Sequence, residues 1–119
     1  MIQENYFKDE AENLNKITFN LSQKYLITNE SLKMKQIQLF ILNLPQDLSK
    51  TQILIEILKN FQISNWQACY LNKSAHADKR IREIRKTPPE GYKLVQIDMP
   101  PIKGYCNTTY LNFKLEREM

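Results

Sequence analysis

The chain has 119 residues, of which 42% are hydrophobic and 25% are charged, and its formal net charge is +4. This length and composition fit one globular domain and exclude wholesale disorder. No apolar run approaches the ~20 residues that span a bilayer, and the two cysteines give neither a disulfide framework nor a zinc-binding spacing.

The first part of the chain predicts two strands. KITFNL (16–21) alternates apolar and polar residues, and although a helix through residues 7–25 also fits the wider pattern, we prefer the strand because β-branched and aromatic residues cluster there. QIQLFILNL (36–44) alternates as well and ends near Pro45, which predicts a central strand buried on much of both faces. One face of that strand would carry Ile37, Leu39 and Ile41.

A helix is predicted from Ser49, followed by another strand. Ser49 and Gln52 have the spacing of a capping box, in which each side chain accepts a hydrogen bond from the backbone of the other residue. The apolar residues that follow at helical spacing are Ile53, Leu54, Ile57, Leu58 and Phe61. NWQACYL (65–71) predicts the next strand, with alternate residues on one face.

The rest of the chain predicts a basic loop and a return to the sheet. Residues 72–91 are too long for an ordinary hairpin loop and end at Pro88, Pro89 and Gly91. YKLVQIDM (92–99) alternates again and predicts a strand that the following prolines stop. TTYLNFKL (108–115) predicts a further strand or a docked tail.

The predicted fold class is α+β, a small antiparallel β-sheet with helices packed on one face and a long basic loop between two strands. The domain is expected to span residues 16–99, with the basic loop at 72–91. Residues 1–15 and 100–119 are expected to be an N-terminal and a C-terminal extension.

The whole net charge lies in residues 73–86, where six basic residues face only Asp78 and Glu83. The six are Lys73, Lys79, Arg80, Arg82, Arg85 and Lys86. Basic side chains gathered in one segment favour binding to phosphate. If all six neutralised a phosphate, affinity would fall roughly a thousandfold between 50 and 200 mM salt. The alternative is a solvated charged loop with no partner.

Other residues that could carry chemistry give weaker signals. His76, the single histidine, is expected near bound phosphate rather than as a general base, because no carboxylate or nucleophile lies at a telling spacing. Trp66 and Tyr70 could stack on bases, but strand spacing favours a core role. The sequence has no phosphate-binding glycine loop, nucleophile elbow or metal cluster, so we expect no enzyme activity, no cofactor and no bound metal.

The order of these segments resembles two families. LFILNL (39–44) and KGYCNTTYLNF (103–113) are similar to the two signatures of RNA-recognition motifs. Residues 16–99 resemble large-subunit ribosomal protein twenty-three, particularly its mitochondrial form. The similarity lies in a strand ending in proline, Ser-Lys at the helix start, a short strand, and a basic extension that returns through Tyr-Lys into a last strand.

The ribosomal resemblance implies a small antiparallel sheet with helices on one face, bound to large-subunit rRNA at the rim of the polypeptide exit tunnel. It implies that the six basic residues, together with Tyr92 and Lys93, contact rRNA, and that neighbouring ribosomal proteins are partners. It also implies the mitochondrial matrix, although MIQENYFKDE resembles no presequence. No membrane span or small-molecule substrate is expected.

Two alternatives remain open. The chain could be a module of the RNA-recognition type that binds single-stranded RNA through Trp66, Tyr70 and the Tyr105/Tyr110 region. It could also be a subunit of a larger protein complex that does not bind RNA.

Overall fold

The computed structural model describes residues 23–118, which form an α+β domain and confirm the predicted class. A long helix runs over residues 23–42, and we call it the long helix. It is followed by α2 (Lys50–Asn60), β1 (Ile63–Ser64), α3 (Asn65–Asn72), α4 (Ala77–Lys86), β2 (Tyr92–Met99) and β3 (Tyr110–Arg117).

The three strands form an antiparallel sheet in the order β1-β3-β2. β2 and β3 pair along their whole length, from Tyr92 opposite Arg117 to Met99 opposite Tyr110. The strand predicted at 92–99 is therefore confirmed, and residues 108–115 supply a strand rather than a tail. Because β3 is the central strand, residues 110–117 belong to the domain and are not an extension.

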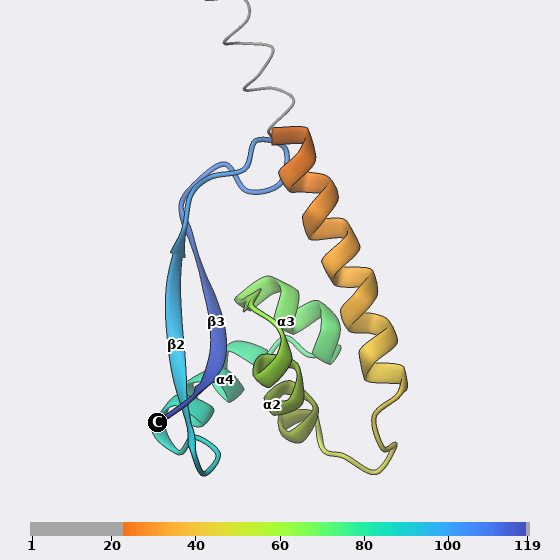
Figure 1. The fold of residues 1–119 in the computed structure, drawn as a ribbon, viewed down its shortest axis with the longest axis vertical. Coiled ribbons are helices and arrows are strands. Elements are labelled where there is room, and N and C mark those ends of the chain that lie inside the picture. The colour runs from red at the N-terminus through yellow and green to blue at the C-terminus, as the bar shows by residue number, and fades with distance from the viewer. Residues whose placement is uncertain (1–22, 119) are drawn as a thin grey trace, which may run out of the picture.

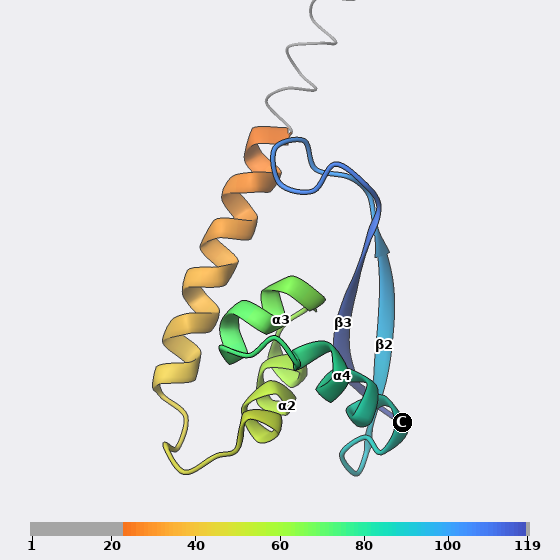
Figure 2. The same ribbon diagram turned by 180° about the vertical axis from the view of Figure 1, so that it is seen from behind.

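The helices lie on one side of the β2–β3 hairpin in both views of the molecule (Figures 1 and 2). The hairpin and the long helix lie on opposite sides of the molecule, and α2, α3 and α4 pack between their lower ends as drawn in Figure 1. The core forms where these elements meet, and all of them contribute fully or almost fully buried side chains. Its members include Ile37, Leu54, Ile57, Leu58, Ile63, Ile81, Ile84, Phe113 and Leu115.

The helix predicted from Ser49 is confirmed as α2, with the capping box in place. The Gln52 backbone N–H donates to the Ser49 hydroxyl at 3.1 Å, and the Ser49 N–H donates to Oε1 of Gln52 at 2.8 Å. These bonds satisfy two of the N–H groups that a helix start leaves unpaired. Leu54, Ile57 and Leu58 form its buried face.

Two predicted strands are wrong. Residues 36–44 lie mostly in the long helix, where Ile37 and Ile41 face inward at a spacing of four residues while Leu39 is 62% exposed. Their alternation came from residues that a helix also places on one face. Residues 65–71 form α3 instead of a strand. The strand predicted at 16–21 lies outside the described residues.

A second capping box starts α3. The Gln67 N–H donates to the Ser64 hydroxyl at 3.3 Å, and the Ser64 N–H donates to Oε1 of Gln67 at 3.0 Å. Ser64 also ends β1, so one residue closes the strand and opens the helix. This tight junction places α3 directly beside the sheet.

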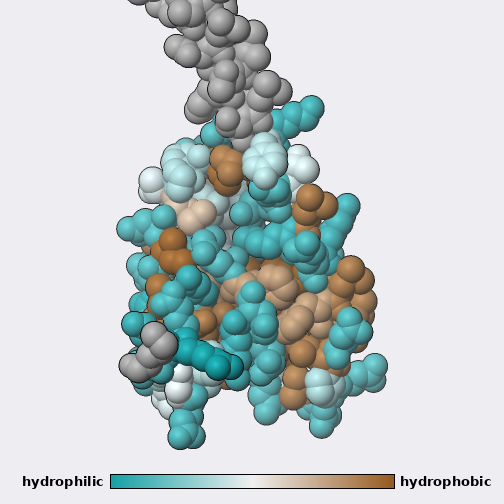
Figure 3. Space-filling view, viewed as in Figure 1, coloured by the Kyte–Doolittle hydropathy of each residue, from teal (hydrophilic) through white to brown (hydrophobic). Residues whose placement is uncertain are grey.

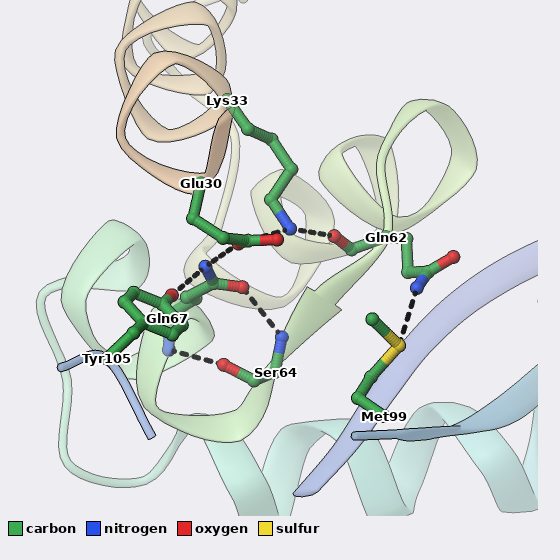
Figure 4. Close-up of polar contacts among 7 residues, drawn as sticks. All are labelled: Glu30, Lys33, Gln62, Ser64, Gln67, Met99 and Tyr105. Carbon is green, nitrogen blue, oxygen red and sulfur yellow. Dashed lines mark hydrogen bonds and ion pairs between the residues drawn. The ribbon is translucent and has the colours of Figure 1, made fainter. Parts of the chain in front are cut away.

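The side chain of Gln67 also ties the long helix and the β2–β3 connection to α3 (Figure 4). Its Nε2 donates to Oε2 of Glu30 at 2.8 Å and contacts the hydroxyl of Tyr105. Glu30 pairs with Lys33 at 2.9 Å, and Lys33 donates to the backbone carbonyl of Gln62. These contacts join three parts of the chain that are far apart in sequence: the long helix, residues 62–67 and the β2–β3 connection.

Tyr110 packs beside this cluster, with its ring centre 4.9 Å from that of Trp66. It is only 9% exposed, and its hydroxyl has no hydrogen-bond partner among the described residues. Burial, followed by the negative charge of Glu30, raises the pKa of Tyr110 to about 12.

We expect Tyr110→Phe to leave the free energy of unfolding at pH 7 unchanged or raise it by about 1 kcal/mol, because it removes an unpaired buried hydroxyl. Wild-type stability should be full below pH 10 and fall as the pH rises toward about 12, since the folded protein holds this proton more tightly than the unfolded chain does. The Tyr110→Phe variant should lose less stability than the wild type over the same rise in pH. Urea unfolding at pH 7, 10 and 11 measures both effects, and equal alkaline losses in the two proteins would contradict the assignment.

Candidate nucleic-acid interface

The segment predicted as a basic loop at 72–91 forms α4 over half of its length, so the prediction of a continuous loop is wrong. Ala77, Ile81 and Ile84 repeat at helical spacing and are buried on the inner face. Asp78 lies in the first turn and Arg85 and Lys86 in the last, which suits the helix dipole. The two isoleucines that interrupt the charges are therefore the residues that fix the helix to the core.

The outward face of α4 carries a ridge of positive charge, formed by Lys79, Arg82 and Lys86, which we call the basic ridge. Their spacing of three and four residues places them on one side of the helix, opposite the buried stripe. The ridge borders a depression of about 450 Å³, which Glu83 and Arg85 also line. Arg82 lies 3.6 Å from Asp78, but both side chains are at least half exposed, so the pair is weak.

Arg80, predicted to contact phosphate, instead contacts the protein. Its Nη1 donates to the Ser74 hydroxyl at 2.8 Å and to Oδ1 of Asn72 at 3.3 Å. Asn72 is buried and donates from Nδ2 to the backbone carbonyl of Lys50 at 2.9 Å. Arg80 therefore joins α4 to the end of α3, and through Asn72 to the start of α2.

We expect Arg80→Met to lower the free energy of unfolding by about 1–2 kcal/mol, because it removes charge-assisted hydrogen bonds to a buried amide and a hydroxyl. Arg82→Met is the matched control, since it breaks only the exposed pair with Asp78 and should change stability by less than about 0.5 kcal/mol. Urea unfolding compares the two variants. Equal losses would show that Arg80 does not join the helices.

Of the remaining predicted residues, Arg85, Tyr92 and Lys93 lie on or against β2, and Lys73 and His76 lie between α3 and α4. Arg85 donates from Nη2 to Oε1 of Gln96 at 2.6 Å, so this guanidinium contacts β2. Tyr92, at the start of β2, accepts a hydrogen bond from Arg117 at 3.3 Å. Lys93 is exposed on β2 opposite Glu116.

Lys73 and His76 bracket the short turn between α3 and α4. Lys73 ends α3 in the left-handed conformation, with φ of 50°, and its backbone N–H bonds to the carbonyls of α3. His76 directly precedes α4, and its exposed side chain does not cap the helix. Both side chains therefore lie at the α3–α4 corner, near the start of the basic ridge.

These elements form a helix-turn-helix followed by a β-hairpin. α3 and α4 are joined by the four residues 73–76 and pack on each other, and α2 packs against both. In proteins that use this motif to bind DNA, the second helix enters the major groove. Here the second helix is α4, which carries the basic ridge outward.

No family model, curated protein or solved structure matches the chain. None of the described helices is long and apolar enough to cross a membrane. Within residues 23–118, no cluster of histidine, cysteine and acidic side chains could hold a metal ion.

Sequence reasoning missed the helix-turn-helix although its signals are present. Ser64 and Gln67 repeat the capping-box spacing of Ser49 and Gln52, which predicts a helix start at residue 65. Ala77, Ile81 and Ile84 give the helical period within the basic segment. Reading these two signals together would have predicted two helices joined by a short turn.

Proposed function

We propose that the chain is a non-catalytic DNA-binding protein that lays α4 in the major groove of duplex DNA. The observation that carries the proposal is the basic ridge on the outward face of the second helix of a helix-turn-helix. Lysine and arginine on such a helix can contact both phosphates and the acceptor atoms of guanine.

The shape of α4 favours DNA over duplex RNA. The major groove of B-DNA is about 12 Å wide and admits an α-helix. The major groove of A-form RNA is deep and narrow, and side chains cannot read it. A helix whose charges lie along one rigid face therefore fits DNA better than it fits an RNA duplex.

The number of free charges sets the expected salt dependence. Arg80 and Arg85 contact the protein, so Lys73, Lys79, Arg82 and Lys86 remain for phosphate. Four neutralised phosphates predict that affinity falls about a hundredfold between 50 and 200 mM salt. The sequence had predicted a steeper fall because it counted all six residues.

Fluorescence anisotropy with the full chain tests the proposal. The probes are a random-sequence 20-base-pair DNA duplex, an RNA duplex of the same sequence, and a single-stranded RNA of the same length. We expect the DNA duplex to bind tightest, by at least tenfold over the RNA duplex. Equal or tighter binding to either RNA would overturn the proposal.

Large-subunit rRNA, predicted as the partner from sequence, stays a second candidate because the same four free charges could contact it. The ribosomal resemblance relied on strands at 36–44 and 65–71, and both segments are helical. Co-sedimentation with large ribosomal subunits at high salt tests this candidate directly. The mitochondrial location stays a prediction.

Binding of single-stranded RNA by a sheet surface has less support. That mode needs exposed aromatic rings on the sheet, on which bases stack. The two aromatic residues of the central strand, Tyr110 and Phe113, are both buried. Tyr110 would have to leave its contact with Trp66 before a base could stack on it.

A further inference from the structure

We propose that the groove between the long helix and α3 binds an acidic amphipathic helix of a partner protein. The groove consists of two adjoining hollows of about 530 and 720 Å³, and both are lined by Gln38 and Tyr70. The hollows contain none of the three residues of the basic ridge, and Lys73 is the one residue that borders the groove and is also counted among the charges free for phosphate. The proposal rests on the groove and does not depend on DNA binding.

The lining of the groove has the composition of an interface core. Trp66 and Tyr70 lie one helical turn apart on α3 and are 42% and 65% exposed. Met34, Ile41 and Leu42 face them from the long helix. Figure 3 shows hydrophobic side chains gathered over the lower half of the long helix. Aromatic residues and methionine are enriched at interfaces, and such grooves accept the apolar face of a helix.

The charges around the groove select an acidic partner. Lys35 borders the first hollow and Lys73 the second, and neither is in an ion pair among the described residues. Glu30, the acidic residue at the groove, is paired with Lys33 at 2.9 Å and accepts a bond from Gln67. The uncompensated charge is therefore positive, and carboxylates beside the apolar face of a bound helix would complement it.

The same charges argue against a second copy of this chain as the occupant. The long helix exposes Lys24 and Lys35, and the chain carries a net charge of +4, so a second long helix in the groove would bring lysines together. Like charges placed across an interface weaken binding.

A nucleic acid strand also fits less well than a helix. The side chains of Met34, Ile41 and Leu42 offer no strong hydrogen-bond partners to base edges, and burying a polar edge unpaired is unfavourable. The Trp66 ring is also less available for stacking on a base, because it packs against Tyr105 and Tyr110.

A display library of 18-residue helices tests the proposal with the full chain as bait. The library fixes leucines at i, i+3, i+4 and i+7 and randomises the flanking positions among Glu, Lys, Gln and Ser. We expect enriched peptides to carry Glu beside the leucine stripe. Enrichment of Lys, or no enrichment over an unrelated bait, would overturn the proposal.

Variants locate the site. Tyr70→Ala should weaken an enriched peptide at least tenfold, whereas Tyr25→Ala, at an equally exposed tyrosine on the long helix, should change its affinity less than twofold. Lys35→Glu should weaken it at least tenfold, and Lys24→Glu less than threefold. Equal effects within either pair would overturn the proposal.

A competition experiment checks the nature of the occupant. If a single-stranded oligonucleotide displaces the peptide, and does so only when Tyr70 is present, the groove binds nucleic acid and the proposal is overturned. Duplex DNA binding should be unchanged in Tyr70→Ala, which separates this result from the DNA-binding test.

Discussion

Replacing Lys79, Arg82 and Lys86 together with alanine is expected to weaken duplex DNA binding by about a hundredfold or more near 0.1 M salt. The three side chains form the basic ridge, and within residues 23–118 their one polar contact is the weak Arg82–Asp78 pair. The slope of log affinity against log salt should fall by about three, one for each lost phosphate contact. Anisotropy titrations at four salt concentrations measure both quantities.

The matched control removes the same charge elsewhere. Lys24, Lys35 and Lys103 are exposed and lie outside α4, so their triple alanine variant has the same net charge as the ridge variant. It should lose less than about fivefold in affinity, because only the long-range attraction is reduced. If both variants lose affinity equally, the chain binds through its overall charge and α4 has no special role.

Ile81→Ala is expected to lower the free energy of unfolding by about 2–5 kcal/mol. Ile81 is 2% exposed and sits in the core cluster with side chains of the other helices and β3. Removing three carbons there loses buried apolar surface and leaves a cavity. For a domain whose total stability is about 5–15 kcal/mol, this loss should be visible in a urea midpoint measured by circular dichroism.

Ile97→Ala provides the comparison, because Ile97 lies half-buried on β2 and outside the core cluster. Its loss should be below about 1.5 kcal/mol, since solvent already reaches much of the side chain. An Ile81 variant as stable as the Ile97 variant would show that α4 is held to the protein by its polar contacts alone.

Sequence predicted the parts of the fold whose signals are local. α2 begins at a capping box and presents its apolar stripe within eleven residues, so the pattern needs no distant contact. β2 alternates over eight residues with both edges marked by turn residues. In each case the period of the side chains matches one type of secondary structure only.

The errors arose in short segments whose apolar residues fit both the two-residue period of a strand and the 3.6-residue period of a helix. Ile37 and Ile41 satisfy both alternation and a spacing of four, and only the longer pattern that includes Met34 and Ile27 separates helix from strand. For α3, the alternation of Trp66, Ala68 and Tyr70 favoured a strand, while the decisive signal was the capping box that precedes the helix. Tertiary contacts then override weak local preferences.

The sequence located the segment where basic residues gather, but it did not predict which of their side chains face solvent. The concentration of charge in residues 73–86 identified α4 as the charged element. Which basic residues face solvent depends on helical phase and on distant partners, such as Asn72 for Arg80 and Gln96 for Arg85. The groove beside α3 could not be predicted, because its two walls are far apart in the chain.

The central position of β3 has a consequence for how the molecule forms. β1 and β2 touch β3 but not each other, and Ile63 finds its partner at Phe113, fifty positions later. During synthesis, the three short helices can pack as soon as they emerge, but neither outer strand has an edge to pair with until β3 is made. Long-range pairings of this kind slow folding, and they leave strand edges open in the nascent chain. The three-stranded sheet can therefore form only after β3, the last strand of the chain, is free to pair.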